Sequence, residues 1–282
     1  MPIQFSRVIG SHAQGNGRTF SVKAIPLAEL GRRASPLLVL DEFRVSGRPF
    51  PPHPHAGFAA VTYVFEDSKG DLRSRDSLGN DLVTGPGGIV WTQAGRGVIH
   101  EELPANPNRE LHAIQLFVNL SSKNKLAPPR MFRLERTAIP EWHSDSGDRV
   151  RVVVGSFEGL SSPLAPVEPF QLFDVELRSD ISFELRAGHN ALVYVVDGDV
   201  IARANGREQK VRGEHAIAIY GGDGEVRFDA APRAHFLILS GAEINEPVAT
   251  EGPFIMNDSA QLADAVARYN AGEMGNLASA SD

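Results

Sequence analysis

Two pairs of side chains in this chain have the types and the spacing of metal ligands. His53 and His55 form one pair, and His100 and Glu102 form the other, each with a single residue between its members. Residues i and i+2 of a β-strand point to the same face, so each pair would share a face if it lay on a strand. Two neighbouring strands would then aim three imidazoles and one carboxylate at a common point, and such groups bind transition metals. The spacing therefore predicts a metal site made of these four residues.

The choice of Glu102 over its neighbour follows from strand parity. If Val98–Leu103 forms a strand, Val98, His100 and Glu102 face one way and Glu101 faces the other. The alternative interpretation is that these are unrelated polar residues on exposed strands. Two same-face pairs beside apolar residues favour the metal site. An octahedral ion on four such ligands would keep positions for water, O₂ or a chelating substrate, which indicates a reactive centre.

Composition limits the other classes of function. The chain has no cysteine, which excludes disulfides, a thiolate nucleophile and sulfur-ligated metal centres. Its 28 basic and 35 acidic side chains give a net charge of −7, which argues against direct binding to nucleic acid. The N-terminus lacks a secretory signal pattern, and no run of about 18 apolar residues could span a membrane. We therefore expect a cytoplasmic protein that does not bind membranes.

Short β-prone runs, interrupted by 27 glycines and 19 prolines, are typical of a β-sandwich or barrel. Hairpin turns are predicted at Asp197-Gly198, Asn205-Gly206 and Gly221–Gly224, because these residue types tolerate positive φ. Helical periodicity predicts a short helix over Asp258–Asn270. The predicted strands are Leu37–Leu40, Val61–Phe65, Ile89–Thr92, Val98–Leu103, Ala113–Leu120, Val150–Val154, Phe170–Glu176, Ile181–Leu185, Ala191–Val196, Val200–Ala204, Ala216–Tyr220 and His235–Leu239.

The strands fall into two series on either side of Ser121–Gly147, which is rich in Pro, Ser, Lys and Arg. This division predicts a duplicated β-barrel. In the second series His189 stands alone, without a histidine or glutamate partner, so we expect that barrel to be metal-free and structural. The predicted domains are a metal-binding N-terminal barrel (1–135), a linker (136–148), a C-terminal barrel (149–250), and a helix with a tail (251–282).

Several motifs along the chain together resemble the pirin family of bicupins. In chain order they are Leu40-Asp41-Glu42-Phe43, His53-Pro54-His55-Ala56-Gly57-Phe58, Asp76-Ser77-Leu78-Gly79-Asn80, the segment from Thr92 through Ala94-Gly95-Arg96-Gly97-Val98-Ile99-His100 to Glu102, Gln115-Leu116, Val118-Asn119-Leu120 and Gly252-Pro253-Phe254-Ile255-Met256-Asn257. The resemblance spans nearly the whole chain. It implies an all-β fold of two cupin (jelly-roll type) β-barrels packed face to face, with a short C-terminal helix.

The resemblance also implies a single metal ion in the N-terminal barrel, at the positions of His53, His55, His100 and Glu102. Iron(II) is the expected ion, and zinc, nickel, manganese, copper and cobalt are alternatives for the same ligand types.

Three positions depart from the family pattern. The family commonly has arginine where this chain has Ala56, an acidic residue near Ala59, and histidine where Ser74 stands. None of the three is an expected ligand, so these changes bear on substrate preference and on the surroundings of the ligands.

Five residues are candidates for roles beside the metal. Glu102 is the predicted catalytic residue, a ligand that also accepts a proton as general base. Phe58, Tyr63, His112 and Gln115 are candidates for the cavity wall. Core packing is the alternative for the aromatic residues, and a packed or solvated ring is the alternative for His112.

Asp41 and Glu42 resemble a general acid–base pair. Adjacent strand residues point to opposite faces, so the two cannot act at one site. We interpret both as structural polar residues at a strand end.

Three functions remain open at this point. The resemblance implies an enzyme like quercetin 2,3-dioxygenase, which opens a flavonol or another chelating hydroxy-keto substrate with O₂. A second hypothesis is an iron-dependent, redox-sensing regulator that binds a transcription factor or a metabolic enzyme. The third is another small-molecule reaction at the same metal, because one fold hosts many chemistries.

Overall fold

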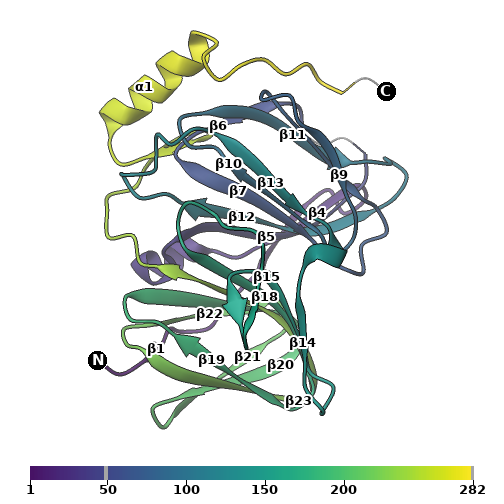
Figure 1. The fold of residues 1–282 in the computed structure, drawn as a ribbon, viewed down its shortest axis with the longest axis vertical. Helices are drawn as coiled ribbons and strands as arrows, with labels where there is room; N and C mark the ends of the chain where they lie inside the picture. The colour runs from purple at the N-terminus through teal and green to yellow at the C-terminus, as the bar shows by residue number, and fades with distance from the viewer. Residues whose placement is uncertain (48–49, 281–282) are drawn as a thin grey trace. The chain divides into compact units, whose positions relative to one another are not determined.

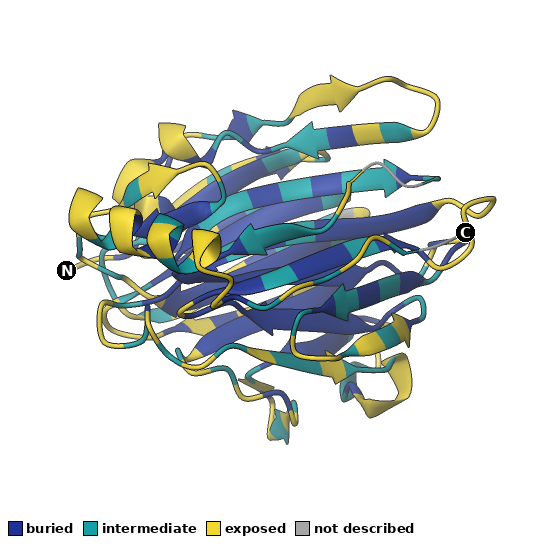
Figure 2. Ribbon diagram, turned by 90° about the horizontal axis from the view of Figure 1, so that it is seen from above, coloured by how far each residue is buried: buried dark blue, intermediate teal, exposed yellow. Residues whose placement is uncertain are grey.

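The structure is a computed structural model that describes residues 1–47 and 50–280, and most of these residues lie in β-strands (Figure 1). Buried residues run along the strands, whereas exposed residues concentrate in the loops and helical turns (Figure 2). Within the described residues, no helix has the length and apolar character needed to cross a membrane.

The chain divides into two compact units. The histidine unit consists of Ala13–Lys23, Val39–Arg136 and Ile244–Asp282, and the companion unit consists of Met1–His12, Ala24–Leu38 and Thr137–Glu243.

The histidine unit has two main sheets, and the four predicted ligands lie on β6 and β11 of the smaller one. The sheet orders are β13-β10-β7-β12-β5-β4-β3 and β6-β11-β8-β9. Its elements are β3 (His12–Gly15), β4 (Phe20–Ala24), β5 (Leu37–Val45), β6 (His53–His55), β7 (Phe58–Val64), β8 (Leu72–Asp76), β9 (Asp81–Thr84), β10 (Ile89–Gln93), β11 (Val98–Pro104), β12 (Leu111–Asn119), β13 (Arg130–Leu134), β24 (Ala249–Glu251), β25 (Phe254–Met256) and α1 (Ser259–Asn270).

The companion unit has a main sheet with the order β1-β22-β20-β23-β18-β15-β14. Its elements are β1 (Gln4–Phe5), β2 (Ile9–Gly10), η1 (Leu27–Glu29), η2 (Gly31–Ala34), η3 (Arg136–Ala138), β14 (Glu141–His143), β15 (Arg149–Val154), β16 (Ser156–Phe157), β17 (Leu160–Ser161), β18 (Phe170–Leu177), β19 (Asp180–Leu185), β20 (His189–Ala204), β21 (Arg207–Arg212), β22 (His215–Tyr220) and β23 (Gly224–Ala242).

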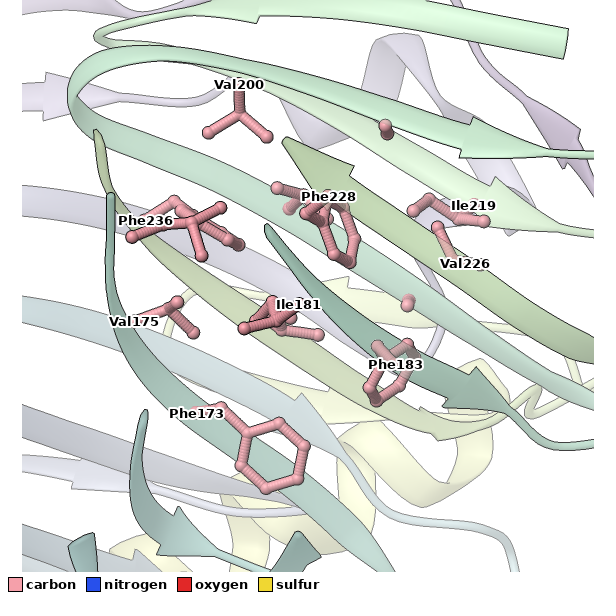
Figure 3. Close-up of a cluster of buried hydrophobic side chains, with 14 of the residues drawn as sticks. Phe173, Val175, Ile181, Phe183, Val200, Ile219, Val226, Phe228 and Phe236 are labelled. Carbon is pink, nitrogen blue, oxygen red and sulfur yellow. The ribbon is translucent and has the colours of Figure 1, made fainter. Parts of the chain in front are cut away.

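Large apolar side chains fill the interior of the companion unit (Figure 3). Phe173, Phe183, Phe228 and Phe236 are all buried there, together with Val and Ile side chains from β18 to β23. His189 begins β20 at the edge of this cluster and shares a strand face with buried Ala191. The described interior of the companion unit near His189 is therefore mainly apolar.

Each predicted strand overlaps an observed strand, although several observed strands are longer, and β20 contains two of the predicted strands. The two compact units are built from non-contiguous segments, unlike the contiguous domains that were predicted. The first strands of the chain, β1 and β2, pair with β22 of the companion unit. The last segment returns to the histidine unit, where Phe254 bridges Ala56. The predicted linker 136–148 contains β14, which pairs with β15. Such pairings join residues far apart in sequence, so local patterns cannot reveal them.

The turn prediction is correct at one Gly-containing pair and wrong at another. Asn205 and Gly206 join β20 to β21 with φ of 50° and 71°, as a tight hairpin turn requires. Asp197 and Gly198 lie inside β20, where the pairing with β23 shifts register. Gly198, with its positive φ, therefore lies at a β-bulge within a continuing strand.

The predicted C-terminal helix is confirmed as α1. Asp258 has extended φ and ψ, and its carboxylate accepts a hydrogen bond of 2.8 Å from the Gln261 backbone N–H. Leu262 and Ala265 are buried in a cluster that also contains Ala56, the neighbour of His55. The helix thus covers the segment that carries two of the predicted ligands.

Asp258→Ala should lower the free energy of unfolding by about 1 kcal/mol, because it leaves one N-terminal backbone N–H of α1 unpaired. Urea unfolding measures this change. Asp264→Ala, on the exposed side of the same helix, is the matched control and should have little effect. An equal loss in both variants would contradict the capping role.

Candidate metal centre

The pairing of β6 with β11 sets the three histidines side by side. The two strands are antiparallel, with His100 opposite His53 and Val98 opposite His55. Residues opposite each other point to the same side of a sheet, as do residues i and i+2 of one strand. All three imidazoles therefore project from one face of this strand pair.

The three rings form a nearly equilateral triangle. The ring centroids of His53, His55 and His100 are 4.7 Å apart in each of the three pairs. One ring nitrogen from each lies within 4.8 Å of the other two. His55 and His100 are buried, and His53 is half-buried. Nitrogen donors at this separation can hold a metal ion between them.

Backbone carbonyls orient the rings of His53 and His55. The Nδ1 atom of His53 lies 2.9 Å from the Pro51 carbonyl oxygen, and Nδ1 of His55 makes a weaker contact of 3.5 Å with the Pro253 carbonyl. A carbonyl oxygen only accepts, so Nδ1 carries the proton in each ring. The lone pair is then on Nε2, which leaves that atom free to bind a metal.

His100 provides the strongest indication that a metal fits. Both of its ring nitrogens are buried without a hydrogen-bond partner among the described residues. A buried polar atom without a partner costs about 1–3 kcal/mol. A cation bound to one of these nitrogens would give that atom a partner. The unpaired state of the His100 ring is therefore what we expect of a metal ligand in the metal-free protein.

His55 and His100 are suited to bind a cation because their imidazoles resist protonation. Burial, together with a charge on neighbouring His53, lowers the pKa of His55 to about 3. Burial and the same neighbouring rings hold the pKa of His100 well below its usual value. Metal binding requires the neutral imidazole, so little proton release would accompany binding at pH 7.

Glu102 lines the same cavity but is not part of the histidine triangle within the described residues. Its Oε2 accepts a hydrogen bond of 2.6 Å from the Thr62 hydroxyl, and its Oε1 accepts one of 3.0 Å from Ser74. Burial raises the pKa of the Glu102 carboxyl, and the two hydroxyl hydrogen bonds oppose this rise. Of the four predicted ligands, the structure brings the three imidazoles together and places the carboxylate beside them.

Glu101 occupies the opposite face of β11, as strand parity predicts. Its carboxylate is buried and lies 2.8 Å from Nη1 of Arg75. It also accepts a hydrogen bond from the backbone N–H of Ala280. Glu101 therefore contacts Arg75 and Ala280 on the outer face of β11 and does not face the cavity.

The histidines lie at the wall of a cavity of about 200 Å³. Its polar lining residues are Asp41, His53, His55, His100, Glu102 and Gln115. The remaining wall is apolar and comes mainly from β4, β5 and β12, with the residues Phe20, Val22, Phe43, Val45, Phe50, Leu72, Leu111 and Phe117. A mostly apolar cavity with a few convergent polar groups is typical of a small-molecule site.

The structure brings one of the four predicted wall residues, Gln115, to the cavity. Phe58 packs edge-on against the His55 ring, at 5.0 Å between centroids, and so supports a histidine without lining the cavity. Tyr63 is five residues from Phe58 on β7, and His112 is three residues from Gln115 on β12. Tyr63 adjoins Thr62, which contacts Glu102, and His112 adjoins Leu111, which lines the cavity. Adjacent strand residues point to opposite faces, so neither Tyr63 nor His112 lines this cavity.

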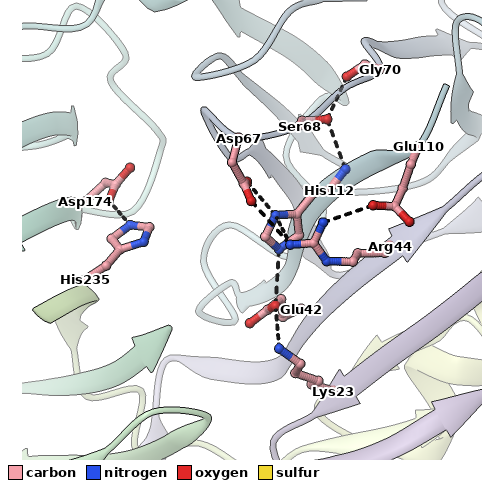
Figure 4. Close-up of polar contacts among 10 residues, drawn as sticks. All are labelled: Lys23, Glu42, Arg44, Asp67, Ser68, Gly70, Glu110, His112, Asp174 and His235. Carbon is pink, nitrogen blue, oxygen red and sulfur yellow. Dashed lines mark hydrogen bonds and ion pairs between the residues drawn. The ribbon is translucent and has the colours of Figure 1, made fainter. Parts of the chain in front are cut away.

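His112 belongs to a separate polar network (Figure 4). Its Nδ1 lies 2.6 Å from Asp67, and its Nε2 lies 3.1 Å from the buried carboxylate of Glu42. Lys23 and Arg44 contact the same two carboxylates, at 3.0 Å and 3.3 Å. This network joins β4, β5 and β12 on the side away from the cavity.

Asp41 was missed as a cavity residue. It lies in the middle of β5 rather than at a strand end, and it lines the cavity together with Phe43 and Val45. Glu42 does point to the opposite face, as predicted. The sequence pattern shows that Asp41 and Glu42 lie on opposite faces of their strand, but it does not show which of these faces lines the cavity.

Thr62 and Ser74 were also missed as partners of Glu102. Ser74 on β8 lies opposite Glu102 on β11. Thr62 on β7 lies opposite Gln115 on β12. The sequence offered one signal for Ser74. The family commonly has histidine at this position, and a polar residue in both cases could have indicated a contact with a site residue.

A buried lysine holds the turn that follows His55. Nζ of Lys125 donates hydrogen bonds to the Gly57 carbonyl, the Ile255 carbonyl and Oδ1 of Asn119, at 2.7–3.2 Å. Burial lowers the pKa of Lys125 to about 8.

Gly57 has φ of 88°, and a Cβ there would lie 1.8 Å from the Ile255 carbonyl oxygen. The approach of β25 to this turn therefore requires glycine.

Comparison with known proteins identifies relatives of this chain. The family model described as Pirin matches residues 18–118, and the model described as Pirin C-terminal cupin domain matches residues 172–275. Pirin from Homo sapiens is 32% identical over 240 residues, which cover 83% of this chain and 81% of the human protein. A pirin-like protein from Caulobacter vibrioides is 36% identical over 231 residues, 79% of each chain. The solved structure of a quercetin 2,3-dioxygenase from Acinetobacter baumannii matches with a TM-score of 0.84 at 27% identity, covering 98% of this chain and 99% of that one.

The metal-free protein should lose stability as the pH falls from about 6.5 towards 3. Over this range the unfolded chain binds a proton at His55 that the folded chain excludes, so the free energy of unfolding decreases by up to about 1.4 kcal/mol per pH unit for each such histidine. Urea unfolding of His55→Phe at several pH values should give a shallower dependence than the parent chain. His12→Gln, at an exposed position, should leave the dependence unchanged; equal slopes in all three proteins would contradict the prediction.

Proposed function

Because this chain belongs to the pirin family, we propose that it is a mononuclear metal enzyme of the quercetin 2,3-dioxygenase type. It would act with O₂ on a flavonol or another compound with a chelating hydroxy-keto edge. The observation that carries this proposal is the triangle of imidazoles beside Glu102 in a mostly apolar cavity. The name of the structural relative from Acinetobacter baumannii supports the same reaction class.

His53, His55, His100 and Glu102 would hold one divalent ion, and we propose iron(II) as the native one. Nitrogen and oxygen donors suit iron, and they also suit zinc, nickel, manganese, copper and cobalt, so metal supply would determine occupancy. When bound, the ion would supply Lewis acidity and redox chemistry, and it would acidify a coordinated hydroxyl.

Glu102 would accept the proton from the ligand's hydroxyl. A carboxylate oxygen has two acceptor positions, so each oxygen keeps one after the hydrogen bonds from Thr62 and Ser74. Those hydroxyls would also fix the orientation of the carboxylate. The raised pKa of Glu102 makes it a stronger base than an exposed glutamate, which favours proton transfer near pH 7.

The apolar wall would bind and orient a planar ring. Phe43 on β5 and Phe117 on β12 contribute aromatic surface to the cavity. Such surface favours ring binding through burial and through aromatic contacts. The same side chains would exclude water from the reacting edge, which strengthens the electrostatic interactions there.

Metal content tests the ligand set. His55→Ala and Glu102→Ala should each lose most bound metal, because each removes a proposed donor. Glu101→Ala should retain one ion per chain, since its side chain faces Arg75. Elemental analysis after loading and desalting measures the stoichiometry. Loss of metal in Glu101→Ala with retention in Glu102→Ala would contradict the assignment.

Turnover tests the reaction class. Iron-loaded protein supplied with quercetin and O₂ should consume both and release carbon monoxide, and His55→Ala should fall to the background rate. Absorbance and a carbon monoxide assay measure the two outcomes. Absence of turnover in protein shown to hold one iron per chain would rule out quercetinase activity.

A further inference from the structure

The cavity contains a second carboxyl group that the proposed reaction does not use. Asp41 projects from β5 on the same face as Phe43 and Val45, and all three line the cavity. The same cavity is lined by the three histidines and Glu102. Asp41 therefore faces the space in which a ligand would lie.

Asp41 differs from Glu102 in having no partner among residues 1–47 and 50–280. Two hydroxyl groups bind the Glu102 carboxylate, whereas no hydrogen bond or ion pair of the described residues reaches the carboxyl of Asp41. Burial alone raises the pKa of Asp41 to about 6. A half-buried carboxyl group without a partner is unfavourable in the empty protein. A ligand with a hydrogen-bond donor would provide the missing partner.

We propose that Asp41 is a recognition residue, which accepts a hydrogen bond from a second hydroxyl group of the ligand, on a part of the molecule other than the chelating edge. This inference rests on the proposed function and narrows its substrate class. The preferred ligands are neutral planar compounds that carry hydroxyl groups at two separate edges.

The charge of the cavity supports a neutral ligand. With a pKa of about 6, most Asp41 is ionised at pH 7 and can accept a charge-assisted hydrogen bond from a phenolic hydroxyl. Glu102 is the other acidic group that lines the cavity. A ligand carboxylate placed near Asp41 would meet a like charge in a poorly solvated space, which is unfavourable.

Two flavonols that share the 3-hydroxy-4-keto edge and differ in their other hydroxyl groups test the proposal. Quercetin and 3-hydroxyflavone share the chelating hydroxy-keto edge, but 3-hydroxyflavone lacks the other hydroxyl groups. Their dissociation constants are measured on the full-length zinc-loaded protein without O₂, so that no turnover occurs. Asp41→Leu should weaken quercetin binding about tenfold or more and change 3-hydroxyflavone binding less than about threefold. Asp264→Asn, an exposed carboxylate on α1, is the control and should change neither.

Thermal unfolding of the ligand-free protein separates recognition from a structural role. Removal of an unpaired, half-buried carboxyl should raise the melting temperature of Asp41→Leu by about 2–4 °C. A structural role would lower it. The expected result is thus a more stable protein that binds quercetin less tightly.

Equal weakening of both flavonols, or no change in either, would overturn the role of Asp41 and leave the proposed function intact. Failure of the parent protein to bind either flavonol would overturn the proposed action on flavonols. In that case a titration with phenol, followed by NMR, still tests Asp41. Loss of phenol binding in Asp41→Leu would support the recognition role, and unchanged binding would overturn it.

Discussion

The antiparallel register of β6 and β11 is the constraint on which the candidate site depends. His100 lies opposite His53, and a shift of one residue would turn His100 to the outer face and bring Glu101 inward. The triangle of imidazoles, with 4.7 Å between ring centroids, exists only in this register. Because the rings of His55 and His100 are buried and their pKa values are lowered, these two imidazoles stay neutral and keep a nitrogen lone pair for a cation.

Parts of the chain far from the histidines hold this register in place. Lys125 joins the turn at Gly57 to β12 and β25, and Phe254 bridges Ala56. The helix α1 packs over the same segment. On the outer face of β11, Glu101 is bound by Arg75 and by the backbone of Ala280. The C-terminal segment thus contacts both histidine-bearing strands, which explains why it belongs to the histidine unit.

The sequence predicted most of what depends on short-range spacing. Strand parity was sufficient to select His53, His55 and His100 for one face and to separate Glu102 from Glu101. The same rule could have shown that Tyr63 cannot share a face with Phe58, nor His112 with Gln115, but it could not show which face lines the cavity. The α1 cap at Asp258 was also visible in the sequence, because capping is a local interaction.

The features that sequence analysis missed depend on long-range packing. Asp41 lines the cavity only because one face of β5 closes the same space as β6 and β11. The partners of Glu102 come from β7 and β8, and the domain boundaries depend on strands that pair across most of the chain. None of these relations leaves a periodic signal in the sequence.

X-ray absorption spectroscopy of the zinc-loaded protein tests the central claim most directly, because it counts the atoms around the ion. Three imidazole nitrogens and additional oxygen donors are expected, with one imidazole fewer in any single histidine variant that still binds. An ion surrounded by oxygen atoms alone would contradict the account.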